Sequence, residues 1–196
     1  MIDLTPFCAG PHELRTYIHK PWRVPEGIVA TNGHILICIP DEGGDFAQEP
    51  ATIKNVVANF TKKYPAGEFV ELSSIPLPDK AICNVCNGTG HYTVTDCDEC
   101  EATGLIYDDA VVGYMDCTKC DGYGFNRTSH GREEMCDYCD GMGEERCIIR
   151  VGIECYQRKY LAQLQTLPNC RLSPSVGTAA RFEFLGGFGW LMPMCK

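Results

Sequence analysis

Eight cysteines of the chain occur as four Cys-x-x-Cys pairs, and each pair begins a repeat of the form Cys-x-x-Cys-x-Gly-x-Gly. We call residues 83–90, 97–104, 117–124 and 136–143 repeats 1 to 4. A Cys-x-x-Cys turn lets two thiolates converge on one ion, and two such turns complete the tetrahedral four-sulfur shell that structural zinc prefers. Four pairs with one glycine spacing therefore predict two closed sites, holding two Zn²⁺ ions.

The glycines of the repeats indicate tight turns, because a ligand turn has to aim backbone N–H groups at the sulfurs and favours residues that tolerate positive φ. Repeat 2 departs from the pattern, since Ala102 stands at its first glycine position. We expect this repeat to be slightly less regular than the others.

These repeats resemble the cysteine-rich zinc domain of DnaJ-type co-chaperones, in which the outer repeats share one zinc ion and the inner repeats share the other. The chain has no His-Pro-Asp tripeptide, the signature of the J-domain, so the resemblance covers the zinc domain alone. It implies a first ligand set of Cys83, Cys86, Cys136 and Cys139. It implies a second ligand set of Cys97, Cys100, Cys117 and Cys120.

Length and composition fit a globular protein of one or two domains, with 196 residues, 44% hydrophobic and 22% charged. The N-terminus has no basic start followed by an apolar run, and no apolar stretch approaches the length of a membrane span. We therefore expect a cytoplasmic protein with no membrane partner. The six other cysteines lie in apolar runs and are interpreted as small buried hydrophobes: Cys8, Cys38, Cys147, Cys155, Cys170 and Cys195.

Negative charge is concentrated in the cysteine-rich stretch. Residues 83–143 hold twelve acidic and three basic side chains, so the whole formal charge of −9 falls there. The rest of the chain has fourteen residues of each sign. Since four thiolates around each zinc add further negative charge, we expect the stretch to repel phosphate backbones.

The two flanks of this stretch predict one discontinuous domain. Residues 1–82 suggest a strand at 2–7, a helix at 10–19, a hairpin turning at Asn32-Gly33, an amphipathic helix at 51–64 and a strand at 68–72. Residues 144–196 suggest a strand at 146–155, a helix at 157–167 and strands at 170–173, 180–185 and 188–194. The predicted fold class is α+β, a duplicated βαβββ domain interrupted by a small, hairpin-rich zinc module at residues 83–143.

Three short strings in the flanks are similar to the bacterial DNA polymerase III beta sliding clamp: Ala-Thr-Asn-Gly-His at 30–34, Arg-Lys-Tyr-Leu at 158–161 and Trp-Leu-Met-Pro-Met at 190–194. A clamp domain is a doubled βαβββ unit, and the flanks would supply one copy. In clamps two helices face DNA. The resemblance thus implies a DNA-facing role for Arg15, Lys20, Arg158 and Lys159.

No residue constellation supports catalysis, since the chain has no Gly-x-Ser-x-Gly, no phosphate-binding glycine loop and no His-Glu-x-x-His. The leading hypothesis is a non-enzymatic protein whose clamp-like scaffold presents the zinc module to protein or unfolded-polypeptide partners. Apolar residues between the repeats could serve that binding or could form the packing of the module itself: Tyr92, Val94, Leu105, Ile106, Tyr107, Tyr114, Tyr123 and Phe125.

Two alternatives stay open. One is a clamp-like accessory of replication or repair that associates with DNA, weakly because its scaffold carries no net charge. The other is a thiol-disulfide oxidoreductase that uses the Cys-x-x-Cys pairs when metal leaves. Zinc occupancy would separate the second alternative from a binding protein. The oligomeric state is left open by the sequence.

Overall fold

The computed structural model describes residues 2–10, 13–51, 54–139 and 141–194 of the chain. The chain divides into two compact units. We call the unit Met1–Pro78 with Cys147–Lys196 the scaffold, and the unit Asp79–Arg146 the zinc module. The division falls within a few residues of the boundaries expected at 82/83 and 143/144.

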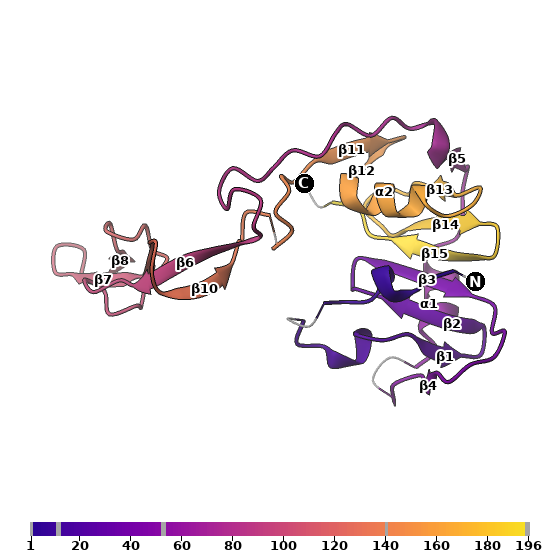
Figure 1. The fold of residues 1–196 in the computed structure, drawn as a ribbon, viewed down its shortest axis with the longest axis horizontal. Helices are drawn as coiled ribbons and strands as arrows, with labels where there is room; N and C mark the ends of the chain where they lie inside the picture. The colour runs from indigo at the N-terminus through magenta and orange to yellow at the C-terminus, as the bar shows by residue number, and fades with distance from the viewer. Residues whose placement is uncertain (1, 11–12, 52–53, 140, 195–196) are drawn as a thin grey trace. The chain divides into compact units, whose positions relative to one another are not determined.

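The scaffold is built on one eight-stranded sheet with the strand order β4-β1-β2-β3-β15-β14-β13-β5. Its strands are β1 (Trp22–Val24), β2 (Gly27–Thr31), β3 (Ile35–Ile39), β4 (Ala47–Gln48), β5 (Val70–Glu71), β13 (Arg171–Ser173), β14 (Ala180–Phe184) and β15 (Gly187–Leu191). Neighbouring strands are antiparallel except β1 and β4, which are parallel. Figure 1 shows strands from opposite ends of the sequence side by side at β3 and β15, where Leu36 pairs with Trp190.

Alternate residues of β3 enter two separate cores. Ile35 and Ile37 belong to one cluster of buried side chains, and Leu36 and Cys38 belong to the other. Because successive side chains of a strand point to opposite faces of the sheet, both faces of β3 are covered. This double burial explains why the strand reads as a continuous apolar run rather than as an alternating one.

Each face of the sheet is covered by one short α-helix. Helix α2 (Arg158–Gln165) buries Leu161 and Leu164 in the first core, and helix α1 (Val56–Lys63) buries Val57 in the second. A further hairpin of β11 (Ile148–Val151) and β12 (Glu154–Gln157) precedes α2. Both helices are amphipathic, as the spacing of their apolar residues predicts.

The hairpin between β2 and β3 forms as predicted, but its turn is displaced by one residue. The N–H of Asn32 donates to the carbonyl of Ile35, so Gly33 and His34 are the central residues of the turn. Gly33 has a φ of 90°, and the N–H of Ile35 donates to the side-chain oxygen of Asn32 at 3.1 Å. The expected turn centred on Asn32-Gly33 is therefore wrong.

Regular structure in the first flank is shorter than predicted. Residues 2–7 were expected to form a strand, and the 3-10 turn η1 (Thr5–Phe7) lies there instead. The helix expected at 10–19 is wrong over its described part, which contains only the 3-10 turn η2 (Thr16–Ile18). Positions 11 and 12 lie outside the described residues.

The predicted α+β class with a duplicated βαβββ unit is also wrong. Strands make up 32% of the described residues and helices 14%, and one large mixed sheet takes strands from both flanks. Two changes break the duplication. Among the described residues the first flank lacks its early helix and gains β1 and β4, and the strand expected at 146–155 is a hairpin that turns at Gly152, whose φ is 61°.

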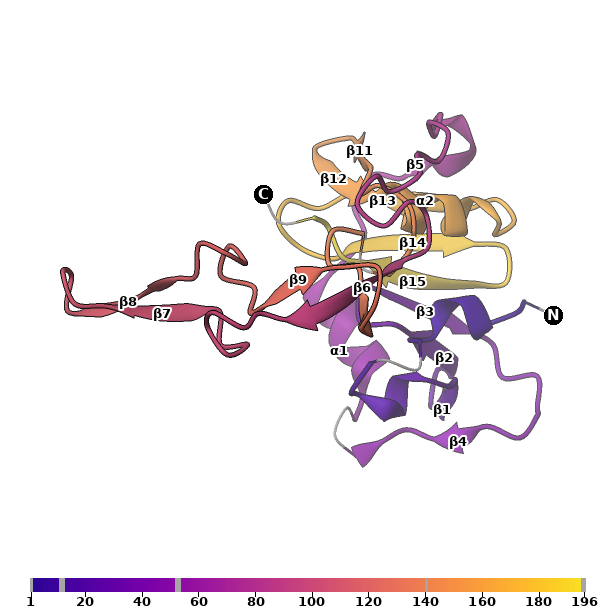
Figure 2. The same cartoon turned by 60° about the vertical axis from the view of Figure 1, so that its left-hand side comes forward.

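The zinc module consists of a three-stranded sheet and a separate hairpin. The sheet has the order β10-β6-β9, and the hairpin pairs two strands only. The sheet strands are β6 (His91–Asp96), β9 (Phe125–Arg127) and β10 (Arg132–Met135), and the hairpin strands are β7 (Leu105–Asp108) and β8 (Gly113–Asp116). Figures 1 and 2 both show the β7–β8 hairpin at one end of the module, beyond β6. No helix in the described part of the chain has the length and apolar character needed to cross a bilayer.

Candidate metal centres

Two buried groups of four cysteines lie in the zinc module, and in each group the four sulfur atoms are within 4.8 Å of one another. Centre 1 contains Cys83, Cys86, Cys136 and Cys139, and centre 2 contains Cys97, Cys100, Cys117 and Cys120. Repeats 1 and 4 thus meet at centre 1 and repeats 2 and 3 meet at centre 2. These are the two ligand sets that the resemblance to DnaJ-type zinc domains implies.

The sulfur spacing fits a tetrahedral shell around a zinc ion. A Zn–S bond of about 2.3 Å places the sulfurs of a regular tetrahedron about 3.8 Å apart. In centre 1 the Cys83–Cys136 and Cys86–Cys139 sulfur distances are 3.9 and 3.7 Å. The corresponding pairs of centre 2 are also separated by 3.9 and 3.7 Å. Each group is therefore suited to hold one metal ion, which confirms the expectation of two separate ion sites.

Each repeat uses its last glycine to donate a backbone N–H to a ligand sulfur. The N–H groups of Gly90, Gly104, Gly124 and Gly143 lie 3.2 to 3.3 Å from the sulfur of the second cysteine of their own repeat. The φ angles of these glycines lie between 72 and 79°. Such N–H···S bonds stabilise the thiolate form, so the turn that positions the ligand also favours its charge.

The last glycine of each repeat is required by the close approach of the partner repeat. A Cβ atom on Gly104 would lie 2.2 Å from the carbonyl oxygen of Gly122, and one on Gly124 would lie 2.4 Å from the carbonyl oxygen of Ala102. The first glycine position is less restricted, since a Cβ on Gly122 would meet its nearest atom, in Asp116, at 3.2 Å. This explains why repeat 2 accommodates an alanine at that position, with a φ of 63° and its N–H bonded to the carbonyl of Cys97.

The four thiols of one centre ionise as a coupled group, in which hydrogen bonds and burial act in opposite directions. Burial opposes the ionisation of Cys86, but the N–H of Gly90 and the neighbouring thiols lower its pKa to about 6. Burial raises the pKa of Cys139, in the same centre, to about 12. Centre 2 repeats the contrast. Hydrogen bonds, the backbone N–H of Cys100 first, lower the pKa of Cys97 to about 7. Four thiolates in so small a volume therefore need the charge of a cation.

The predicted polypeptide-binding residues separate into two groups. Val94 is fully buried, and Tyr92 and Ile106 pack against the cysteines of centre 1 and centre 2, respectively. Phe125 is half-buried, with its ring centroid 5.8 Å from that of Tyr123. The remaining members, Leu105, Tyr107, Tyr114 and Tyr123, are exposed. The module thus uses part of this set for its own packing and exposes the rest.

The four basic residues predicted to face DNA are largely engaged within the scaffold. Arg15 is exposed, and its guanidinium pairs with the carboxylate of Glu13 at 2.9 Å. Arg158 is half-buried at the start of α2, and its Nε donates to a backbone carbonyl at 2.5 Å. The ammonium of Lys159 lies 4.7 Å from the centre of the neighbouring tyrosine ring. Lys20 is exposed.

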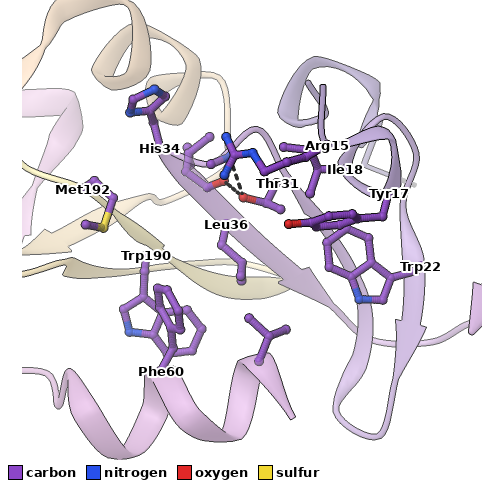
Figure 3. A pocket seen from close by; sticks show the side chains of 13 residues that line it. Arg15, Tyr17, Ile18, Trp22, Thr31, His34, Leu36, Phe60, Trp190 and Met192 are labelled. Carbon is purple, nitrogen blue, oxygen red and sulfur yellow. Dashed lines mark hydrogen bonds between the residues drawn. The ribbon is translucent and has the colours of Figure 1, made fainter. Parts of the chain in front are cut away.

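The scaffold also contains an apolar cavity of about 140 Å³ that was not predicted from the sequence. Tyr17, Trp22, Phe60 and Trp190 form much of its wall, as Figure 3 shows. The rings of Phe60 and Trp190 meet edge to face with centroids 5.5 Å apart. Both tryptophans of the chain line this cavity, and the indole nitrogen of Trp22 is buried with no hydrogen-bond partner among the described residues.

No family model, no curated protein and no solved structure matches this chain. Its function is therefore inferred from the chemistry and exposure of its own residues.

Proposed function

We propose that the chain is a non-enzymatic zinc-binding protein whose zinc module, of the type found in DnaJ-like co-chaperones, offers a docking surface for a polypeptide partner. The observation that carries the proposal is the exposure of Leu105, Tyr107, Tyr114 and Tyr123 on a unit that has almost no apolar core. Burial of these apolar side chains would stabilise the module, so folding does not explain why they are exposed. Clustered apolar side chains on a charged surface are typical of protein-binding sites.

The geometry of the cysteines favours a structural role over thiol-disulfide exchange. A closed four-sulfur shell leaves no coordination position and no free thiolate, and structural zinc sites have this form. Two buried scaffold thiols are also poor nucleophiles, because burial raises the pKa of Cys38 to about 11 and that of Cys170 to about 12. Exchange activity would therefore require loss of the metal.

Charge disfavours nucleic acid as the partner of the module. The stretch of residues 83–143 carries the whole formal charge of −9, and its few basic groups are paired. Lys119 contacts Asp98 at 2.6 Å, and Arg132 forms ion pairs with Asp96 and Glu134. A surface of this sign repels phosphates and attracts cationic side chains.

The proposal is tested with reduced, carboxamidomethylated ribonuclease A as a permanently unfolded, cationic polypeptide and native ribonuclease A as the folded control. We expect the zinc-loaded protein to bind the unfolded form alone, and we expect binding to be lost when a chelator removes zinc under reducing conditions. Calorimetry reports the affinity, and metal analysis should give two zinc ions per chain. Equal binding with and without zinc, or no binding of the unfolded form, would contradict the proposal.

Oxidoreductase activity is tested in the same preparations by insulin reduction with dithiothreitol. We expect the zinc-loaded protein to give no acceleration over dithiothreitol alone. Acceleration by the metal-loaded protein, together with oxidised Cys-x-x-Cys pairs in the protein as isolated, would favour the enzyme instead.

A further inference from the structure

The β7–β8 hairpin exposes a larger apolar surface than the residues predicted from the sequence. On one face Tyr107 pairs across the strands with Tyr114, and their rings meet edge to face with centroids 5.5 Å apart. At the tip, Val111 and Val112 are 59 and 77% exposed. The tip valines contact no core of their own among the described residues, since neither belongs to a buried cluster.

Val112 also has an unfavourable backbone conformation. Its φ is 50°, in the left-handed region, and it is the single β-branched residue in that region among the described residues other than glycine. The four-residue loop 109–112 needs a left-handed residue to return the chain into β8. Glycine or asparagine satisfies this need without strain, and asparagine does so at Asn55, Asn87 and Asn169. A strained, exposed valine therefore points to selection for contact rather than for folding.

Acidic side chains surround this apolar surface. Residues 97–124 contain seven acidic residues and a single lysine, Lys119, which is paired with Asp98. Asp108 and Asp109 precede the tip, and Asp116 ends β8. The sulfurs of centre 2 add further negative charge when they hold zinc. A partner of the hairpin would therefore have to combine apolar side chains with positive charge.

Main-chain groups at the outer edges of β7 and β8 can bind a partner strand. The two strands pair only with each other among the described residues. An added strand would place alternate side chains beside Tyr107 at the edge of β7, or beside Tyr114 at the edge of β8, and the intervening ones on the opposite face, because side chains alternate along a strand. The acidic residues at both ends of the hairpin belong to the surface that the partner strand would cover. They would therefore contact the cationic side chains of the partner.

We propose that the β7–β8 hairpin, with its tip at Val111 and Val112, binds an extended polypeptide segment in which basic residues alternate with apolar ones. This inference rests on the proposed function and specifies the partner of the zinc module. It assigns the contact to the tip valines and the Tyr107–Tyr114 pair, and the selectivity to the surrounding carboxylates.

Two ten-residue fluorescein-labelled peptides serve as probes, one alternating Lys with Val and Leu, and the other with Glu in place of every Lys. We expect the zinc-loaded chain to bind the basic peptide at least about tenfold more tightly than the acidic one, with an affinity that falls as salt rises. Fluorescence anisotropy measures both. Equal binding of the two peptides would overturn the charge assignment.

Val112→Gly separates binding from folding. Relief of the strained φ should leave the melting temperature unchanged or raise it, whereas loss of the side chain should weaken binding of the basic peptide at least about fivefold. Tyr107→Ala should weaken binding by a similar factor. Leu185→Ala and Val176→Gly are matched controls, because both residues are exposed and lie in the scaffold, and they should bind as the unchanged chain does.

The outcomes distinguish this inference from the proposed function. If the unfolded ribonuclease A binds and the hairpin variants bind the basic peptide as well as the unchanged chain, the hairpin assignment is wrong and the polypeptide-binding function stands. If neither the peptides nor the unfolded ribonuclease A bind, the proposed function itself fails. Val112-dependent binding to phosphatidylcholine vesicles with no binding of peptide would replace the polypeptide by a membrane surface and overturn the inference.

Discussion

The two units of this chain are stabilised in different ways. The scaffold buries aromatic and aliphatic side chains on both faces of its sheet, in two extended clusters. In the zinc module, Val94 is the single buried hydrophobic side chain among the described residues apart from the eight cysteines of the two centres. Hydrophobic burial can therefore stabilise the scaffold, whereas the module depends on its two metal centres.

Backbone conformation shows the same contrast. In the module, left-handed residues recur at fixed places in every repeat, and the N–H groups of the last glycines point at sulfur. In the scaffold sheet, the position of each residue is set by the alternation of apolar side chains between two cores. The module is thus specified by short turns around ions, and the scaffold by long-range packing between its two flanks.

Removal of zinc should have the largest effect, because it should unfold the zinc module and leave the scaffold folded. Structural zinc contributes about 10 kcal/mol or more to small zinc domains, and the module has no core to replace it. We expect a chelator under reducing conditions to abolish the protection of amides in Asp79–Arg146 while those of the scaffold sheet stay protected. Hydrogen exchange followed by mass spectrometry measures this.

Re-addition of zinc is the control for that experiment and should restore the protection. Cys136→Ser sharpens it, because the substitution removes one ligand of centre 1 and none of centre 2. Loss of protection in the scaffold strands after chelation would show that the units are coupled in stability.

Leu164→Ala should have the next largest effect and should act on the scaffold alone. The side chain is fully buried in the core under α2, so its loss should lower the free energy of unfolding by about 2 to 5 kcal/mol. Urea unfolding followed by tryptophan fluorescence reports it, since Trp22 and Trp190 both lie in the scaffold. Zinc content should stay at two ions per chain.

Leu185→Ala is the matched control for this substitution, because its side chain is 70% exposed at the turn between β14 and β15. It should change the free energy of unfolding by less than about 0.5 kcal/mol. A similar effect of both leucine substitutions would contradict the assignment of the core.

A smaller effect should distinguish the two glycine positions of a repeat. Gly104 and Gly122 have nearly the same φ, 77 and 80°. Only at Gly104 would an added Cβ lie 2.2 Å from a backbone oxygen. Gly104→Ala should weaken zinc binding at centre 2 at least tenfold, or about 1.4 kcal/mol. Gly122→Ala should cost about 1 kcal/mol or less, since Ala102 already occupies the equivalent position in repeat 2.

Competition with a coloured chelator measures the zinc affinity of both variants. Equal losses would show that the φ angle, rather than the approach of the partner repeat, makes glycine necessary.

Much of the metal chemistry could be predicted from the sequence, because the ligands and turns of a Cys-x-x-Cys repeat are local. Spacing alone predicted two ion sites, and the resemblance added the pairing of repeats. Exposure of single residues could not be predicted, since Tyr107 and Ile106 are neighbours of similar character and only their alternation along β7 separates them. The tip at Val112 was missed because nothing in the sequence indicates a left-handed valine.

The scaffold was predicted less well, because its sheet depends on contacts between distant segments. The hairpin of β2 and β3 was predicted from a local turn signal and is present. The short strands β1 and β4 were missed, since a two- or three-residue strand has no periodicity and forms only where a neighbour offers an edge. The helix expected at 10–19 failed for a related reason. Its apolar residues are too few for a helical face, and Ile18 reaches the second core from a 3-10 turn.

The smallest effect is expected with duplex DNA, and it compares the charge of the two units. The intact chain should bind labelled duplex weakly or not at all at physiological salt, because the net negative charge lies in the zinc module and the scaffold is nearly neutral. Replacing Arg15, Lys20, Arg158 and Lys159 with Ala should change little, since Arg15 and Arg158 are already engaged with a carboxylate and a carbonyl. Fluorescence anisotropy across a salt series measures both. Tight binding that weakens steeply with salt and is lost in the fourfold variant would instead make the scaffold a DNA-binding unit. The acidic module would then limit the affinity of the scaffold for DNA by electrostatic repulsion.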